Sequence, residues 1–146
     1  TAGRIMAKGL KTLVRLSEWT VDEKRRSLGV LLRQFDELEA SLANLEKELI
    51  VEQRAAAASP HEAGINYGRY AASVISRREY LNRAIETMET QIVSAREDLS
   101  DAYLELKKYE VAERNRKQRE TDELDRREQS VLDDIGLEMA RRRSKN

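Results

Sequence analysis

The stretch SPHEAGIN at residues 59–66 contains the only proline and the only histidine of the 146-residue chain. Long segments rich in Ala, Leu, Glu, Lys and Arg flank it on both sides. Pro60 lacks a backbone N–H and disfavours a helical conformation in the residue before it. Gly64 and Asn66 are residue types that end one helix and cap the next. The stretch therefore predicts a single turn between two long helices.

The composition around this turn is that of paired helices and not of a wide globular core. Charged residues make up 37% of the chain, which has one Trp, one Phe and a mean hydropathy of -0.73. Richness in Ala, Glu, Lys, Leu and Arg with few aromatics is typical of coiled coils. The 27 basic residues equal the 27 acidic ones in number, so bulk charge favours neither nucleic acid nor an anionic membrane as a partner.

Three absences limit the sequence further. The chain has no Cys, so it can form neither a disulfide nor a thiolate metal site. No apolar run approaches the roughly 20 residues that span a bilayer, and no signal-peptide pattern is present, so we expect a cytoplasmic protein without direct membrane insertion. We interpret residues 1–5, which precede Met6, as a cloning remnant.

Apolar residues recur at alternating spacings of three and four on both sides of the turn, which is the pattern of a coiled-coil seam. We expect the first helix over residues 6–58, the turn over residues 59–66 and the second helix over residues 67–143, with a frayed end at residues 144–146. The predicted core positions are Leu28, Leu31, Phe35, Leu38, Leu42, Leu45, Leu49, Val74, Leu81, Ile85, Met88, Ile92, Leu99 and Leu106.

The two seams point to the same turn. Pairing Leu49 with Val74 in an antiparallel arrangement also aligns Leu42 with Leu81, and the centre of this register falls inside residues 59–66. We therefore predict an all-α fold, an antiparallel two-helix coiled-coil hairpin whose second helix is longer and overhangs the first from about residue 114. Because such a hairpin satisfies its own seam, the chain is expected to be monomeric when free.

The expected overhang is polar on all sides at its start. Residues 113–130 contain six basic and six acidic side chains, and Leu124 is their only aliphatic residue. A helix of this kind either stands in solvent on local ion pairs or lies inside a partner. A hairpin alone needs no such extension, so the overhang is the strongest functional feature of the pattern.

Other polar features have simple structural explanations. His61 has Glu62 alone beside it, whereas a metal or proton-transfer site needs several converging side chains, so a solvated loop histidine is favoured. The basic cluster at residues 141–145 lacks interleaved aromatics, which favours a solvated terminus over a nucleic-acid site. Asp133 and Asp134 have no cleft around them that would exclude water. We expect no catalytic residue, cofactor or metal, and no enzyme activity.

Five motifs stand along the chain in a distinctive order and spacing. They are LKTLVRL at residues 10–16, VDEKRR at residues 21–26, NYGRY at residues 66–70, LELKKYE at residues 104–110 and EQSVLDDIGL at residues 128–137. Together they resemble the bacterial flagellar export protein FliJ family, in the style of its alphaproteobacterial members. The resemblance covers the chain from Met6 onward.

The resemblance implies a non-enzymatic, cytoplasmic component of the flagellar type III export apparatus, peripheral to the membrane at the flagellar base. In that family an antiparallel coiled coil acts like a rotary stalk: it binds the hexameric export ATPase, promotes its assembly or activity and links it to the membrane export gate. Family members are also credited with escorting export chaperones. Three alternatives stay open, namely a mobile chaperone escort, the equivalent stalk protein of a virulence type III secretion system, and a generic structural coiled coil.

Apolar residues near both termini lack a partner inside the predicted hairpin, and we expect their surroundings to contact the export ATPase. The candidate ATPase-binding residues are Leu13, Leu16, Trp19, Arg126, Arg127, Leu132, Asp133, Ile135 and Met139. A second set lies off the seams and is expected to bind a chaperone or the export gate. Its members are Val30, Leu32, Ile75, Tyr80 and Tyr103.

Overall fold

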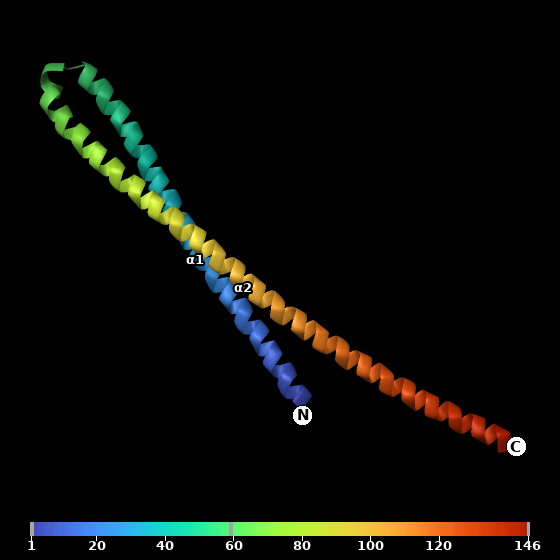
Figure 1. Cartoon of the computed structure of the whole chain (residues 1–146). Helices are drawn as coiled ribbons and strands as arrows, with labels where there is room; N and C mark the ends of the chain where they lie inside the picture. Colours follow the sequence, from blue (N-terminus) through green and yellow to red (C-terminus); the bar gives the residue numbers. More distant parts are fainter. Residues whose placement is uncertain (1, 59, 146) are drawn as a thin grey trace. The chain divides into compact units, whose positions relative to one another are not determined.

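The computed structural model of the protein describes residues 2–58 and 60–145, without the side chains of residues 60–66. It contains two α-helices, the 57-residue α1 at Ala2–Ala58 and the 86-residue α2 at Pro60–Lys145 (Figure 1). Both helices contain the strong helix formers Ala, Leu, Glu, Lys and Arg throughout.

α2 begins at Pro60, earlier than the expected start at residue 67. Proline suits the first position of a helix, because its missing N–H would have no partner there and its fixed φ is already helical. A glycine inside a helix costs only about 1 kcal/mol relative to alanine, so Gly64 alone does not keep this segment out of the helix. Ser59 and the side chain of His61 lie outside the described residues.

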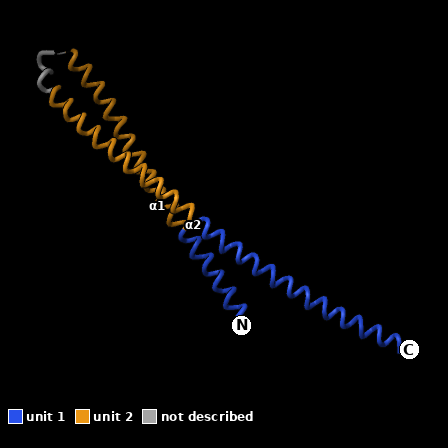
Figure 2. The backbone as a smooth tube through the Cα atoms, viewed as in Figure 1, with its two compact units in different colours: residues 1–20, 103–146 blue, residues 21–102 orange. Residues whose placement is uncertain are grey.

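The chain divides into two compact units (Figure 2). Unit 1 comprises residues 1–20 and 103–146, and unit 2 comprises residues 21–102. Each unit combines a segment of α1 with a segment of α2.

Unit 2 holds the most deeply buried apolar side chains of the described residues. Leu45 and Val74 are 1% and 2% exposed, and they cluster with buried Leu81. Leu42 and Tyr70 are among the partly buried residues that pack against this cluster. Ile92 is also buried, and every other predicted core position is at least partly buried. Removal of these side chains from water is the main force that holds the two helices together.

The helices of unit 2 run antiparallel. Arg78 Nε lies 2.8 Å from Glu46 Oε1, and Arg77 Nη1 lies 3.9 Å from Glu48 Oε2. Farther from the turn, one groove is lined from within residues 34–41 and residues 80–91, and another from within residues 24–31 and residues 91–98. Along these contacts, residue numbers in α1 fall as residue numbers in α2 rise, so the two segments are antiparallel. The predicted all-α hairpin with a longer second helix is therefore confirmed.

Unit 1 is more polar inside. Ser17 and Glu113 are buried, while Leu10, Val14 and Leu106 are partly buried. Asp122 is the last partly buried residue of α2, and all residues from 123 to 145 are exposed.

Candidate partner-binding surface

The candidate surface is built on the part of α2 that no other described segment covers. We call residues 123–145 the tail, since each of them is exposed. The predicted overhang starts earlier, at about residue 114, but Arg116 and Asp122 are still partly buried in unit 1. α1 begins at Ala2, so its first turns lie beside this portion of α2 in the antiparallel arrangement.

Local ion pairs support the tail as a helix. Arg127 Nη2 donates to Glu123 Oε1 at 2.7 Å, one turn earlier. Near the end of α2, the Glu138 carboxylate lies 3.7 Å from Arg141 Nη1 and 3.5 Å from Arg142 Nε. Pairs at spacings of three and four each stabilise an isolated helix by about 0.2–0.5 kcal/mol. The tail therefore has its own source of helical order.

A denser cluster of charges lies just before the tail. Arg116 donates to both oxygens of Glu113 at 3.1 and 3.0 Å and to Glu120 Oε2 at 2.8 Å. Glu113 is only 8% exposed. The hydrogen bond from Arg116 lowers the pKa of Glu113 below its usual value although burial raises it, and the charge of Lys11 adds to the lowering. A buried carboxylate is thus kept ionised where the first turns of α1 meet α2.

Exposed apolar residues line one side of the tail. We call Leu124, Val131, Leu132, Ile135 and Met139 the apolar stripe, and each of them is about half or more exposed. Their spacings of three, four and seven place them on one side of a helix with 3.6 residues per turn. Leu137 is also exposed, but the same geometry places it on the opposite side.

A second exposed apolar face lies in the same unit. We call Ile5, Met6, Leu13, Leu16 and Trp19 the outer face of α1. Trp19 is 63% exposed, and all five residues belong to the exposed class. The partly buried or buried residues Leu10, Val14 and Ser17 lie on another side of the same helix, toward α2. Unit 1 thus presents two apolar faces that its own helices leave uncovered.

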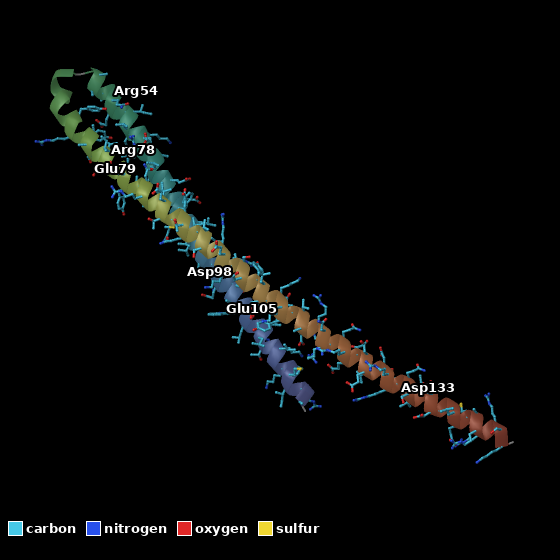
Figure 3. All side chains as sticks on the ribbon, in the orientation of Figure 1. Arg54, Arg78, Glu79, Asp98, Glu105 and Asp133 are labelled. Atoms are coloured by element: carbon cyan, nitrogen blue, oxygen red, sulfur yellow. The ribbon has the colours of Figure 1, made fainter. Side chains whose placement is uncertain are left out.

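The structure places all nine candidate ATPase-binding residues in unit 1 and exposes each of them. Arg127 is held by Glu123, and Asp133, labelled on α2 in Figure 3, accepts a hydrogen bond from Gln129 at 3.0 Å. Sequence reasoning left out Leu124 and Val131 as site residues. Their seven-residue separation was the available signal, because it continues the period of a coiled-coil seam into the tail.

The second candidate set is not uniform. Val30, Ile75 and Tyr80 are exposed on unit 2, with Tyr80 70% exposed. Leu32 is partly buried, since it directly follows the core position Leu31 and flanks the seam. Tyr103 belongs to unit 1 and is exposed.

Titratable groups elsewhere on the two helices form structural contacts. The Glu105 carboxylate raises the pKa of Tyr109 by accepting a hydrogen bond from its hydroxyl. Burial, assisted by the charge of Glu48, raises the pKa of Tyr70 in unit 2. Across residues 2–58 and 60–145, no group of three His, Cys, Asp or Glu side chains is placed to hold a metal ion. These contacts do not assemble a reactive centre among the described side chains.

Comparison with known proteins identifies a family for the chain. Among the helices described, none combines the length and apolar character needed to cross a membrane. The family model for the flagellar FliJ protein matches residues 6–145, nearly the whole chain. No curated protein sequence and no solved structure matches. The chain therefore belongs to the flagellar FliJ family, whose members are non-enzymatic components of the flagellar export apparatus.

Proposed function

We propose that this protein acts as a stalk of the export apparatus, binding the hexameric export ATPase through unit 1, promoting its assembly or activity and linking it to the export gate. The proposal places it in the cytoplasm, peripheral to the membrane at the flagellar base, and includes the alphaproteobacterial type that its motifs resemble. The observation that carries the proposal is the tail, a fully exposed helix with an apolar stripe and its own ion pairs.

The apolar stripe supports a protein partner. Single exposed apolar residues are common, but several of them on one side of an uncovered helix are typical of an interaction site. Amphipathic helices dock by laying positions i, i+3, i+4 and i+7 into an apolar groove. Leu132, Ile135 and Met139 follow this spacing as positions i, i+3 and i+7, with Val131 beside them.

The ion pairs support a helix that is ordered before it docks. One ion pair joins Arg127 to Glu123, one helical turn apart. Glu138 forms ion pairs with Arg141 and Arg142 in the next turn. A tail that is already helical loses less conformational freedom on binding than a disordered one. At 1.5 Å per residue it extends about 35 Å, enough to enter a ring of subunits.

The test is titration of the chain into the cognate export ATPase while ATP hydrolysis and ring formation are followed. We expect the full chain to stimulate both, and a chain truncated after Asp122 to lose most of the stimulation. Truncation at this point keeps the ion pairs of Arg116 with Glu113 and Glu120 intact. Unit 2 should keep its helical signal in both chains.

A matched pair of substitutions locates the contact. Leu132→Asp with Ile135→Asp places charge in the apolar stripe and should weaken binding at least tenfold. Leu137→Asp introduces a single negative charge at a similarly exposed leucine on the opposite side and should bind like the unaltered chain. Equal binding by all three chains would refute the tail as the ATPase contact.

Exposed residues on unit 2 favour a second role, binding of an export chaperone or the gate. Ile75 and Tyr80 offer apolar surface within two helical turns of one another. We expect Tyr80→Ala to weaken capture of a chaperone or gate domain without changing ATPase stimulation. Loss of ATPase stimulation in this variant would argue that a single surface serves both partners.

A further inference from the structure

Unit 1 carries two apolar faces of the same length. The outer face of α1 extends from Ile5 to Trp19, and the apolar stripe extends from Leu124 to Met139. Each covers roughly 21–23 Å along its helix at 1.5 Å per residue. Within one chain they cannot cover each other, because the stripe lies on α2 beyond the portion that α1 accompanies.

The same two segments carry opposite charge. Residues 5–19, which span the outer face, contain three basic residues and one acidic residue. Residues 124–139, which span the apolar stripe, contain five acidic residues and two basic ones. Asp125, Glu128 and Asp134 have no ion pair within the part of the chain that the structure describes. The part of the tail that carries the apolar stripe therefore has a net negative charge, although residues 141–145 add four basic residues, and the part of α1 that carries the outer face has a net positive charge.

Part of the two faces aligns residue by residue. In a parallel alignment that sets Leu16 beside Ile135, Leu13 lies beside Leu132, whereas Met6 lies beside Asp125 and Trp19 beside Glu138. This alignment further brings Arg15 to Asp134. One like-charged pair, Lys8 with Arg127, opposes these contacts.

The stripe points in the direction that such a pairing needs. Leu124 follows buried Glu113 by eleven residues, which is three helical turns. The stripe therefore continues the side of α2 that faces α1 within unit 1. A helix of another molecule can therefore pack on the tail along the same side of α2 that α1 covers earlier in the helix.

We propose that a second copy of the chain covers these faces, forming a two-fold symmetric dimer through unit 1. The stripe of each copy packs on the outer face of α1 of the other, and the two α2 helices run antiparallel with the α1 segments between them. The two-fold axis relates two identical contacts between a stripe and an outer face. Both copies then have both faces covered, so the assembly is closed and does not grow into filaments. This pairing differs from the monomer expected from the seams, because it uses two faces that those seams leave uncovered.

The dimer does not depend on the proposed stalk function, and its test uses the full chain alone. Sedimentation or light scattering at tens of micromolar should give twice the 16.8 kDa of one chain, falling to one chain on dilution. Ile135→Asp should be monomeric with an unchanged helical signal. Leu137→Asp, on the opposite side of the tail, should remain dimeric.

Cysteine pairs test the register, because the chain has no Cys of its own. A mixture of Leu16→Cys and Ile135→Cys chains should form a disulfide between copies under mild oxidation. Leu16→Cys alone should not, since the symmetric arrangement separates its two copies by roughly 40 Å. A monomer at all concentrations, or crosslinking of Leu16→Cys with itself, overturns the proposal. ATPase stimulation by a strictly monomeric chain would leave the stalk function standing and remove only the dimer.

Discussion

The paired part of α2 in unit 2 and the tail of the same helix maintain helical structure by different means. In unit 2, Val74 and Leu81 are buried against α1 with Leu45. In the tail every residue is exposed, and contacts such as Arg127–Glu123 stay within the helix. Burying one such side chain contributes about 1.5–3 kcal/mol, whereas one local ion pair contributes about 0.2–0.5 kcal/mol. A helix can therefore continue beyond its core, and its apolar residues are then free for partners.

The largest expected effect tests whether Leu45 anchors the pair. Leu45→Ala should lower the free energy of unfolding by about 2–5 kcal/mol, because it leaves a cavity beside Val74 and Leu81. Thermal and urea unfolding followed by circular dichroism measure the change.

Ile50→Ala is the matched control, since Ile50 lies on the same helix but belongs to the exposed class. It should change the free energy of unfolding by no more than about 0.5 kcal/mol. Similar losses in both variants would contradict the assignment of the core to Leu45.

Gly→Ala substitutions at two positions compare how strongly helix propensity affects stability in the paired helix and in the tail. An added Cβ meets nothing within 4 Å at Gly29 or at Gly136. Gly29→Ala should raise the free energy of unfolding by about 1 kcal/mol through helix propensity. Gly136→Ala should raise the helical signal at low temperature without moving the main transition, because the tail contributes no core contact.

Thermal melts of the two glycine variants, recorded at equal concentration, distinguish these outcomes. An equal shift of the main transition for Gly136→Ala would mean that the tail unfolds together with the paired helices. It would then have to be protected by a partner, such as a second copy.

The seams predicted the hairpin because apolar periodicity is a local property of the sequence. Leu45, Val74 and Leu81 could be placed in the core from spacing alone, and the longer second helix followed from the distance between the turn and each end. The start of α2 could not be predicted from spacing, because Pro60 is compatible both with a helix break and with the first turn of a helix. The choice depends on the rest of the helix, not on the proline.

The candidate surface was harder to predict than the fold. Leu132 and Ile135 were found as apolar residues without a partner, but Leu124, although noted as the only aliphatic residue among charged neighbours, was not assigned to the site. The burial of Glu113 was also missed, since a charged residue near the end of a pair is normally expected in solvent. Its partner Arg116 lies on the same helix, at a spacing that is common on exposed faces.

A smaller effect is expected at the ion pair between the helices of unit 2. Arg78 is labelled in Figure 3, and its Nη2 donates to Glu46 Oε2 at 3.0 Å. The two side chains are 35% and 48% exposed, so water screens the attraction. Arg78→Met should lower the free energy of unfolding by less than about 1 kcal/mol, and the loss should shrink in high salt.

Arg77→Met provides the comparison, because Arg77 lies 3.9 Å from Glu48 and both side chains are more exposed. Its effect should be smaller than that of Arg78→Met at low salt. A larger effect for Arg77→Met would show that burial does not set the strength of these pairs.

The smallest expected effect depends on pH and concerns Glu113 of unit 1, which precedes the tail along α2. The pKa of Glu113 is lowered in the folded chain by its hydrogen bond from Arg116. A carboxyl with a lowered folded pKa adds stability above its unfolded pKa of about 4.3, and this contribution is lost as the pH falls through the folded value. The unaltered chain should therefore be more stable than Glu113→Gln at pH 7, and the difference should narrow below about pH 4.3.

Thermal melts of both chains between pH 7 and pH 3 measure this difference, and Arg116→Met should remove most of it by taking away the guanidinium. A difference that stays constant with pH would mean that Glu113 contributes through packing alone. A difference that grows in acid would contradict the lowered pKa, because protonation would then favour the folded state.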